Sequence, residues 1–227
     1  MKASKKPNTK IVTDKIQPQT PTRKRVRLSP EVRRQQILDA ALVEFSALGF
    51  AGATTARIAR RAGTTQSNIY VHFADKEEIF ETLLRQVLVP NKGLWAPIEE
   101  GRNASEVIDT FLNDAYERMT ATSIATIRLL ITEGHRVPDL IRRWFNEAVE
   151  PVRAEQHRRI EQYVAAGKMK PSPLSKDFSF ITSPLVHAAV MTMIFPEDIA
   201  RNAITQIRET HRQSLHLLLG TDGGLKE

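Results

Sequence analysis

Residues 53–73 read ATTARIARRAGTTQSNIYVHF, and this stretch decides the fold. It predicts two short helices joined by a tight turn at Gly63, with almost no charge on the outward side of the second helix. That second helix begins with Gln66, Ser67 and Asn68. Uncharged donors and acceptors match the edges of bases, while aromatic hydroxyl and imidazole groups reach phosphates. The pattern therefore favours a helix that inserts into a DNA groove.

The composition of the 227-residue chain favours an all-α fold in one large domain or two small ones, because helix formers dominate and alternating strand patterns are scarce. The chain has no cysteine, which excludes disulfides and thiolate metal sites. The basic N-terminus lacks the apolar segment of a signal peptide, and no stretch approaches the roughly 20 apolar residues of a membrane span. We expect a cytoplasmic protein without a cofactor, a metal site or a membrane partner.

The net charge of +7 is concentrated at one end of the chain. Residues 1–29 hold nine basic residues and one acidic residue, while the rest of the chain holds 24 basic and 25 acidic residues. This tail has few apolar side chains and is predicted to be disordered. Two interpretations of it stay open. It is either an arm that follows phosphates or enters a minor groove, or a solubilising leader.

Capping residues and apolar periodicity divide the chain into successive helices. Ser29 and Pro30 supply an N-cap and a first helical residue, and Gly49 should end that helix. Thr54 and Thr65 should cap the next two helices. Asp75 with Glu78 predicts a fourth helix to about Val89, and later helices are expected over about 104–119, 122–133, 138–166, 176–195 and 196–219. Pro151 should kink the helix that contains it, and Pro184 should strain or divide the next one.

The order and spacing of these residues match a known family. The matching positions are Ile37-Leu38-Asp39-Ala40-Ala41, Phe45, Gly49-Phe50, Thr54-Thr55, Ile58-Ala59, Ala62-Gly63, Ile69-Tyr70, His72-Phe73 and Lys76-Glu77. Residues 31–91 thereby resemble the DNA-binding region of the tetracycline-repressor (TetR) family of bacterial regulators. The resemblance is weaker afterwards, at 133–140, 150–151 and 165–168. Thr64-Thr65 replaces the usual Val-Ser, and Ser67 stands where Gly or Pro is frequent, which leaves the operator sequence open.

The resemblance implies three regions and a set of DNA contacts. The regions are a disordered basic tail (1–29), a helix-turn-helix domain (30–91) and a ligand-binding and dimerisation domain (92–220). Base contacts are implied for Gln66, Ser67, Asn68 and Val71; phosphate contacts for Thr55, Arg57, Tyr70, His72 and Lys76; and helix caps within the interface for Thr54 and Thr65. The chemistry agrees, because Gln and Asn bond adenine, Val packs on a thymine methyl, and helix N-termini attract phosphates. Alternatives are that Tyr70 is an aromatic at the core edge, and that Arg60 and Arg61 form a solvated face.

One reading helix gives too few base contacts for a specific genomic site, so a homodimer on a roughly palindromic operator is expected. The resemblance places the dimer seam on the last two long helices. The candidate seam residues are Val186, Ala189, Val190, Met193, Ile204, Ile207, Leu215 and Leu218. The alternative is that these apolar faces close the core of a monomer.

Residues 104–166 should enclose an apolar pocket for a hydrophobic or aromatic effector. The candidate lining residues are Trp95, Phe111, Tyr116, Met119, Leu129, His135, Trp144, Phe145, His187 and Met191. The resemblance implies a repressor that this unknown effector releases, through the helix from Lys76 and the segment ending near His135. The alternative is an effector-independent DNA-binding or architectural protein. No enzyme is expected, because the chain lacks a cysteine nucleophile, a phosphate-binding glycine loop and a zinc-binding pair, and His211 and His216 are five residues apart.

Overall fold

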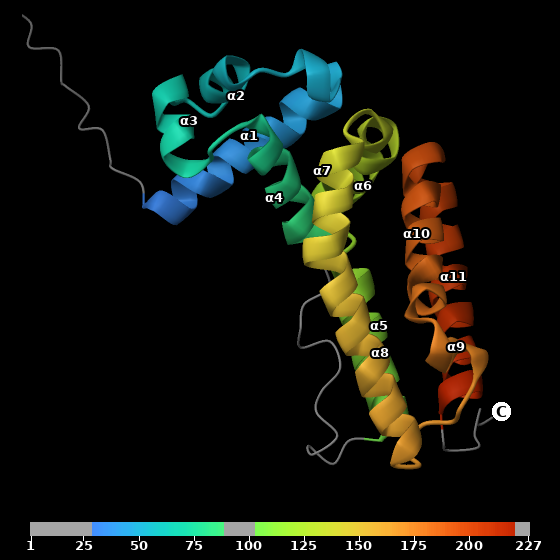
Figure 1. Cartoon of the computed structure of the whole chain (residues 1–227). Coiled ribbons are helices and arrows are strands. Elements are labelled where there is room, and N and C mark those ends of the chain that lie inside the picture. Colours follow the sequence, from blue (N-terminus) through green and yellow to red (C-terminus); the bar gives the residue numbers. More distant parts are fainter. Residues whose placement is uncertain (1–28, 89–102, 221–227) are drawn as a thin grey trace, which may run out of the picture.

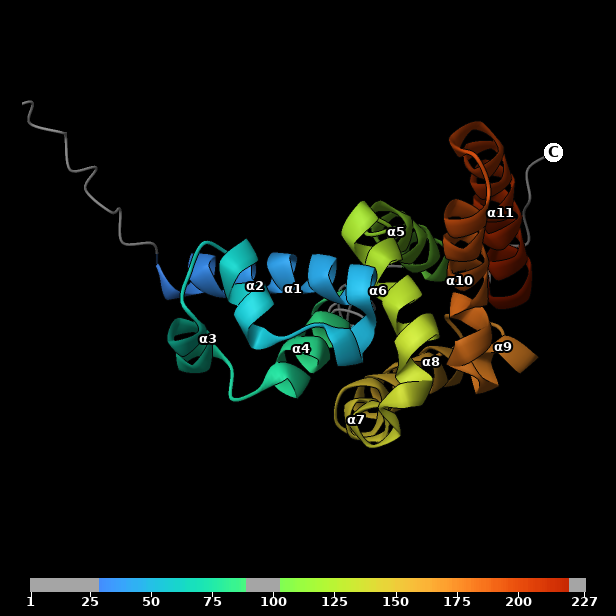
Figure 2. The same ribbon diagram turned by 90° about the horizontal axis from the view of Figure 1, so that it is seen from above.

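The structure is a computed structural model that describes residues 29–88 and 103–220. Within these ranges every regular element is helical, which confirms the prediction of an all-α fold. Figure 1 shows α1–α4 at one end of the molecule and the paired α10 and α11 at the other, and Figure 2 shows the same separation from above. The predictions for the basic tail, for Trp95, for a fourth helix reaching Val89 and for the last seven residues lie outside the described residues.

The N-terminal part consists of a helix-turn-helix and two flanking helices. Its elements are α1 (Pro30–Gly52), α2 (Thr55–Arg61), α3 (Gln66–His72) and α4 (Lys76–Leu88). The predicted caps are confirmed: the hydroxyls of Ser29, Thr54 and Thr65 each accept a main-chain N–H from the first turn, at 3.2–3.3 Å. Each such cap stabilises a helix by about 1 kcal/mol. Local chemistry therefore fixes where these short helices begin.

A buried apolar cluster holds α1–α4 together. Ile58, Ile69 and Phe73 are almost fully buried, so α2 and α3 pack on α1 through their predicted inner faces. The rings of Phe45, Phe50 and Phe80 lie 5.2–5.6 Å apart between centroids and join α1 to α4. Aromatic pairs at this spacing add to the stabilisation from burial alone. The scaffold behind α3 is therefore rigid.

Gly49 interrupts α1 where the sequence predicted an end. Its backbone lies at φ 68° and ψ 172°, although one further helical turn follows it to Gly52. This conformation is nearly exclusive to glycine. The main-chain N–H of the next residue, Phe50, donates to the Glu133 carboxylate at 2.8 Å, a contact with α6 (Ala121–Glu133) in the C-terminal part.

The C-terminal part contains the remaining helices. After α5 (Ala104–Glu117) and α6 come a 3-10 turn (Gly134–Arg136), α7 (Pro138–Trp144), a π-helical turn (Phe145–Val149), α8 (Glu150–Ala165), α9 (Pro173–Lys176), α10 (Phe178–Ile194) and α11 (Glu197–Leu219). A second core forms among α5, α8, α10 and α11. None of the helices in the described ranges is both long and apolar enough to cross a membrane.

The two prolines affect their helices in different ways. The irregularity that Pro151 causes is a π-helical turn just before it, in which Glu150 N–H donates to the carbonyl of Phe145. The wider turn accommodates a proline that removes a donor from the helix. Pro184 does not divide its helix, since α10 is continuous from Phe178. One turn further along the same helix, Ala188 and Ala189 are fully buried.

Candidate functional site

The outward face of α3 is exposed and carries no acidic or basic residue in its first turn. Gln66 and Ser67 are exposed, Tyr70 is 53% exposed and Val71 is 75% exposed, although both of the last two are large apolar or aromatic residues. When large apolar side chains next to one another stay exposed to solvent, they often form a binding surface. The structure thus brings together on one surface most of the residues predicted to contact bases.

A chain of hydrogen bonds connects this face to the start of α2. Gln66 Nε2 donates to Thr55 Oγ1 at 2.8 Å, and Thr55 Oγ1 lies 3.3 Å from the Tyr70 hydroxyl. Hydrogen bonds with Thr55 and Gln66 lower the pKa of the Tyr70 phenol below its usual value. The three side chains are therefore held in one arrangement before any ligand arrives, which reduces the conformational entropy lost on binding.

Asn68 lies in the first turn of α3 and is half-buried. Its Nδ2 donates to Thr64 Oγ1 at 2.9 Å, across the first turn of α3. Thr64 stands in the turn where the sequence departs from the family pattern, and its hydroxyl supplies the acceptor for this contact. The Thr64 hydroxyl therefore orients the Asn68 amide, which is predicted to contact a base.

Arg57, a predicted phosphate contact, has a partner within the protein, and so has Arg61. Arg57 Nε donates to Glu44 at 3.0 Å, and Arg61 Nε donates to the other oxygen of the same carboxylate at 2.6 Å. Hydrogen bonds from Arg61 and Arg57 hold the pKa of Glu44 below its usual value. Glu44 is only 4% exposed. Its role as the acceptor for two arginines was not predictable from the sequence around it. Arg57 is therefore engaged by Glu44, although its side chain is still 45% exposed.

Lys76 caps the C-terminal end of α1. Its ammonium donates to the carbonyls of Phe50 and Ala53, at 2.6 and 3.1 Å, and lies 4.2 Å from the centre of the Phe50 ring. These contacts satisfy carbonyl groups that the helix end leaves without partners. His72 is half-buried, and its carbonyl accepts a hydrogen bond from Arg34. The prediction of Lys76 as a phosphate contact did not include this structural role.

A partly open cavity lies beside the end of α4 and is bounded by α5, α6, α7, α8 and α10. Its volume is about 440 Å³, within the usual range for small-molecule sites. Most of its lining is aliphatic, with polar groups from Arg118, Ser123, Arg153, Ser179 and Thr182. This cavity is called the inner cavity below.

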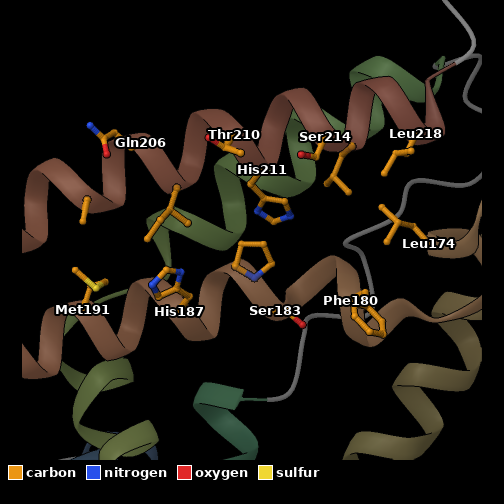
Figure 3. A pocket seen from close by; sticks show the side chains of 14 residues that line it. Leu174, Phe180, Ser183, His187, Met191, Gln206, Thr210, His211, Ser214 and Leu218 are labelled. Atoms are coloured by element: carbon orange, nitrogen blue, oxygen red, sulfur yellow. The ribbon is translucent and has the colours of Figure 1, made fainter.

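A second hollow of about 680 Å³ lies between α10 and α11 and is called the α10–α11 groove. In Figure 3, Thr210, His211 and Ser214 of α11 face Ser183, His187 and Met191 of α10 across it. Ile207, Leu215 and Leu218, three of the predicted seam residues, also line this groove, although Leu215 is only 1% exposed. Two others need correction: Ala189 is fully buried inside the protomer, and Val186 lines the inner cavity instead of the groove.

The predicted pocket residues divide among several places. Met119 and Trp144 line the inner cavity, and His187 and Met191 line the α10–α11 groove. The other described candidates line neither hollow: the buried Phe111, Tyr116 and Leu129 pack in the two cores, and His135 and Phe145 are exposed. The sequence missed Arg118 and Arg153, because helical periodicity does not show which charged residues border an internal space.

Comparisons with known proteins support the regulatory interpretation of this geometry. Residues 37–83 match the model of the family described as bacterial regulatory proteins, tetR family. The HTH-type transcriptional regulator BetI of Paraburkholderia phytofirmans is 30% identical over 149 residues, which cover 66% of this chain and 69% of BetI. The chain belongs to the TetR family. It is a DNA-binding transcriptional regulator, as are the relatives that it matches, and theirs is a non-enzymatic role.

Other relatives of this TetR-family regulator match shorter stretches or the fold alone. SrpR of Pseudomonas putida is 46% identical over 54 residues, which are 24% of this chain and 25% of SrpR. A TetR-family structure from Mesorhizobium loti superposes with a TM-score of 0.62 at 16% identity, covering 86% of this chain and all of the other. The SmeT–triclosan complex superposes with a TM-score of 0.55 at 17% identity, covering 85% and 93% of the two chains.

Three carboxylate contacts connect the DNA-binding helices of this TetR-family chain to its C-terminal part. Glu133 accepts the Phe50 N–H, as described above. Glu81 of α4 is mostly buried and accepts from Arg143 of α7 at 3.0 Å. Arg85 of α4 lies 3.0 Å from Glu147. These polar contacts tie α1 to α6 and tie α4 to α7 and the π-helical turn, and α4 also packs directly against α6, the segment that ends near His135.

A buried pair joins α5 to α11 beside the groove. The Tyr116 hydroxyl lies 3.2 Å from His211 Nδ1. Burial raises the pKa of Tyr116 to about 12, while burial lowers the pKa of His211, opposed by the nearby main chain of Ile181. Tyr116 therefore stays neutral at physiological pH, and burial favours the neutral form of His211.

We expect the stability of this TetR-family chain to fall as pH decreases below about 6.5, the usual pKa of a histidine. His211 in the unfolded chain then binds a proton that the folded chain does not, so protonation favours unfolding. Denaturant titrations at pH 7.5 and 5.5, at one protein concentration, test this. The decrease in the free energy of unfolding from pH 7.5 to 5.5 should be smaller for His211→Gln than for the original chain. An equal decrease in both would show that His211 does not cause the pH dependence.

Proposed function

We propose that this chain is a homodimeric repressor that reads a roughly palindromic operator with α3 and leaves it when a small molecule fills the inner cavity. Residues 30–91 act as the DNA-reading part and residues 92–220 as the part that binds the effector and the second protomer. The observation that carries the proposal is the exposed, uncharged face of α3, held by the Gln66–Thr55–Tyr70 hydrogen bonds. Such a face matches base edges in a major groove.

The proposed contacts divide by chemistry. Gln66, Ser67, Asn68 and Val71 face bases, where amides bond adenine and a valine methyl packs on thymine. Thr55, Tyr70, His72 and the N-terminus of α4 at Lys76 face phosphates. Arg57 also contributes, because its side chain remains 45% exposed beside Glu44. Thr54 and Thr65 hold the first turns of α2 and α3 in place.

Tyr70→Phe should weaken operator and random DNA alike, by a factor of about 5, because the lost hydroxyl contacts a phosphate and carries no sequence information. The slope of log affinity against log salt should stay the same, since a neutral phenol releases no counterion. Fluorescence anisotropy at several salt concentrations measures both quantities. A loss confined to the operator would instead place Tyr70 against a base.

The α10–α11 groove is the proposed seam between protomers. Leu218, which lines it, is 39% exposed. Val190, Met193, Ile204 and Ile207 remain partly accessible on the same two helices, so a second copy seated there would bury these residues further.

Leu218→Glu should raise the dimer dissociation constant by a factor of about 100 or more, because it buries an unpaired charge in the seam. Sedimentation analysis measures the association. Val43→Glu places the same charge on an exposed valine of α1 and should leave the association unchanged. If both variants associate like the original chain, the seam lies elsewhere.

Release by an effector follows from coupling between the inner cavity and the reading part. The cavity is bordered by Val87 and Leu88 at the end of α4, and α4 is tied to α7 by the Glu81–Arg143 pair. A ligand that prefers the arrangement incompatible with DNA lowers operator affinity by its differential affinity for the two states. The SmeT–triclosan complex, of similar fold, is consistent with a small-molecule ligand for this chain.

Thermal-shift screening followed by DNA-binding assays tests the release. A compound that raises the melting temperature of the free protein and lowers its affinity for the operator supports the repressor. Compounds that bind and leave operator affinity unchanged favour the alternative of an effector-independent DNA-binding protein.

A further inference from the structure

Glu44 is a buried carboxylate of α1 whose charge depends on α2. It stands next to Phe45, a residue of the N-terminal core, and is 4% exposed. Its carboxylate accepts from Arg57 Nε at 3.0 Å and from Arg61 Nε at 2.6 Å. A buried charge that loses its partners is strongly unfavourable. The fold therefore favours the state in which both arginines stay on Glu44.

The two arginines lie on a helix that borders the DNA-reading face. The Thr55 hydroxyl in the first turn of α2 contacts Gln66 and Tyr70 of α3. Arg57 belongs to the same turn, and Arg61 follows four residues later on the same side of α2. Their side chains are 45% and 47% exposed. Arginines placed in this way, without a carboxylate, are suited to contact the phosphates of any duplex.

Glu44 opposes the attraction of these arginines to phosphates in two ways. The three side chains together carry one positive charge, where the arginines alone would carry two. Hydrogen bonds from Arg61 and Arg57 also hold the pKa of Glu44 below its usual value, so the carboxylate stays charged near neutral pH. A phosphate must therefore compete with a permanently charged acceptor that is already in place.

We propose that Glu44 limits the sequence-independent affinity of this chain for DNA, by competing with phosphates for Arg57 and Arg61. Phosphate contacts supply essentially all of the affinity for random DNA, so a weaker attraction through α2 leaves a larger share of binding to the base contacts of α3. Glu44 touches no DNA in this account, and it acts as a positioning residue that determines specificity. The inference rests on the proposed DNA-reading role of α2 and α3, and it needs neither the dimer seam nor an effector.

Glu44→Gln keeps the size of the side chain and removes its charge. Each arginine that this variant frees for a phosphate should steepen the slope of log affinity against log salt by about 0.9, which corresponds to about eightfold tighter binding at about 0.1 M salt. Fluorescence anisotropy of the full chain on a random-sequence duplex, at several salt concentrations, measures both quantities. An unchanged slope with equal or weaker binding would overturn the proposal, because a carboxylate that only stabilises the fold does not alter counterion release.

Glu155→Gln is the matched control for the change in net charge. Glu155 also pairs with two arginines, Arg158 and Arg159, but it belongs to α8, which lies away from α2 and α3 in Figure 1. Charges more than about 10 Å from the DNA are largely screened at about 0.1 M salt. This variant should therefore leave both the slope and the affinity unchanged. An equal steepening in Glu44→Gln and Glu155→Gln would assign the effect to net charge and contradict the proposal.

Arg61→Gln tests the proposal while Glu44 remains in place. Because the carboxylate already holds Arg61, this variant alone should leave the salt slope on random DNA unchanged. In the Glu44→Gln background the same substitution should remove about half of the added slope, since one of the two freed arginines is gone. A slope that flattens by about 0.9 in Arg61→Gln alone would show that Arg61 binds a phosphate despite Glu44, against the proposal.

The original chain, measured in the same assay, separates this inference from the proposed function. If it binds neither the random duplex nor its operator, the proposed DNA-reading role fails and the inference fails with it. If it prefers the operator and Glu44→Gln leaves the salt slope unchanged, the inference alone fails.

Discussion

Gly49→Ala is expected to lower the free energy of unfolding by about 3 kcal/mol, the combined cost of a strained backbone and a steric clash. At φ 68° and ψ 172° the backbone of Gly49 is in a region that residues with a Cβ almost never adopt. A Cβ placed there would lie 2.9 Å from Glu133 Oε2. Because Glu133 also accepts the Phe50 N–H, it is held in place and moves away only by giving up that bond.

Gly63→Ala is the matched control for this prediction. Gly63 also has a positive φ, 62°, but an added Cβ would meet nothing within 4 Å. Gly63→Ala should therefore lower the free energy of unfolding only by the backbone cost of about 1 kcal/mol. In a Glu133→Ala background the loss from Gly49→Ala should shrink, because the clash is gone and the two positions are coupled. Equal losses at Gly49 and Gly63, measured by denaturant unfolding, would show that Glu133 is not packed against this turn.

Asn68→Ala is expected to weaken operator binding by about 1–3 kcal/mol and to leave binding to random DNA nearly unchanged. The amide is oriented by Thr64 at the start of α3, where it can bond a base edge, and base contacts alone distinguish sequences. Competition assays with operator and scrambled duplexes at one salt concentration measure the difference.

Asn146→Ala serves as the control, because Asn146 is an exposed amide in the π-helical turn between α7 and α8, and these two helices lie away from α3 in Figure 1. It should change neither affinity. If Asn68→Ala weakens specific and random DNA equally, Asn68 contacts the DNA backbone, and the assignment of base contacts to α3 is wrong at this position.

The sequence predicted the helices of the reading part well because their signals are local. Ser29, Thr54 and Thr65 are separated from the N–H groups they cap by only three residues, so their effect is visible in the sequence itself. The glycine at 49 was likewise recognised as a break. What that break packs against was not predictable, because Glu133 is 83 residues further along the chain from Phe50.

The candidate sites were predicted less completely for the same reason. Whether Arg57 is free for DNA depends on Glu44, and whether Lys76 is free depends on the end of α1, and both contacts are made only in the folded chain. In the C-terminal part, periodicity identifies the inner face of a helix. It does not distinguish Phe111, which packs in the core, from Trp144, which borders the inner cavity.

Selection of bound sequences from a pool of random duplexes, followed by affinity measurements on the selected and scrambled DNA, tests the central claim most directly. If α3 reads bases, selection should converge on a two-fold symmetric sequence that binds at least ~10³-fold more tightly than scrambled DNA at about 0.15 M salt. The account is contradicted if the protein binds every duplex with the same affinity at each ionic strength.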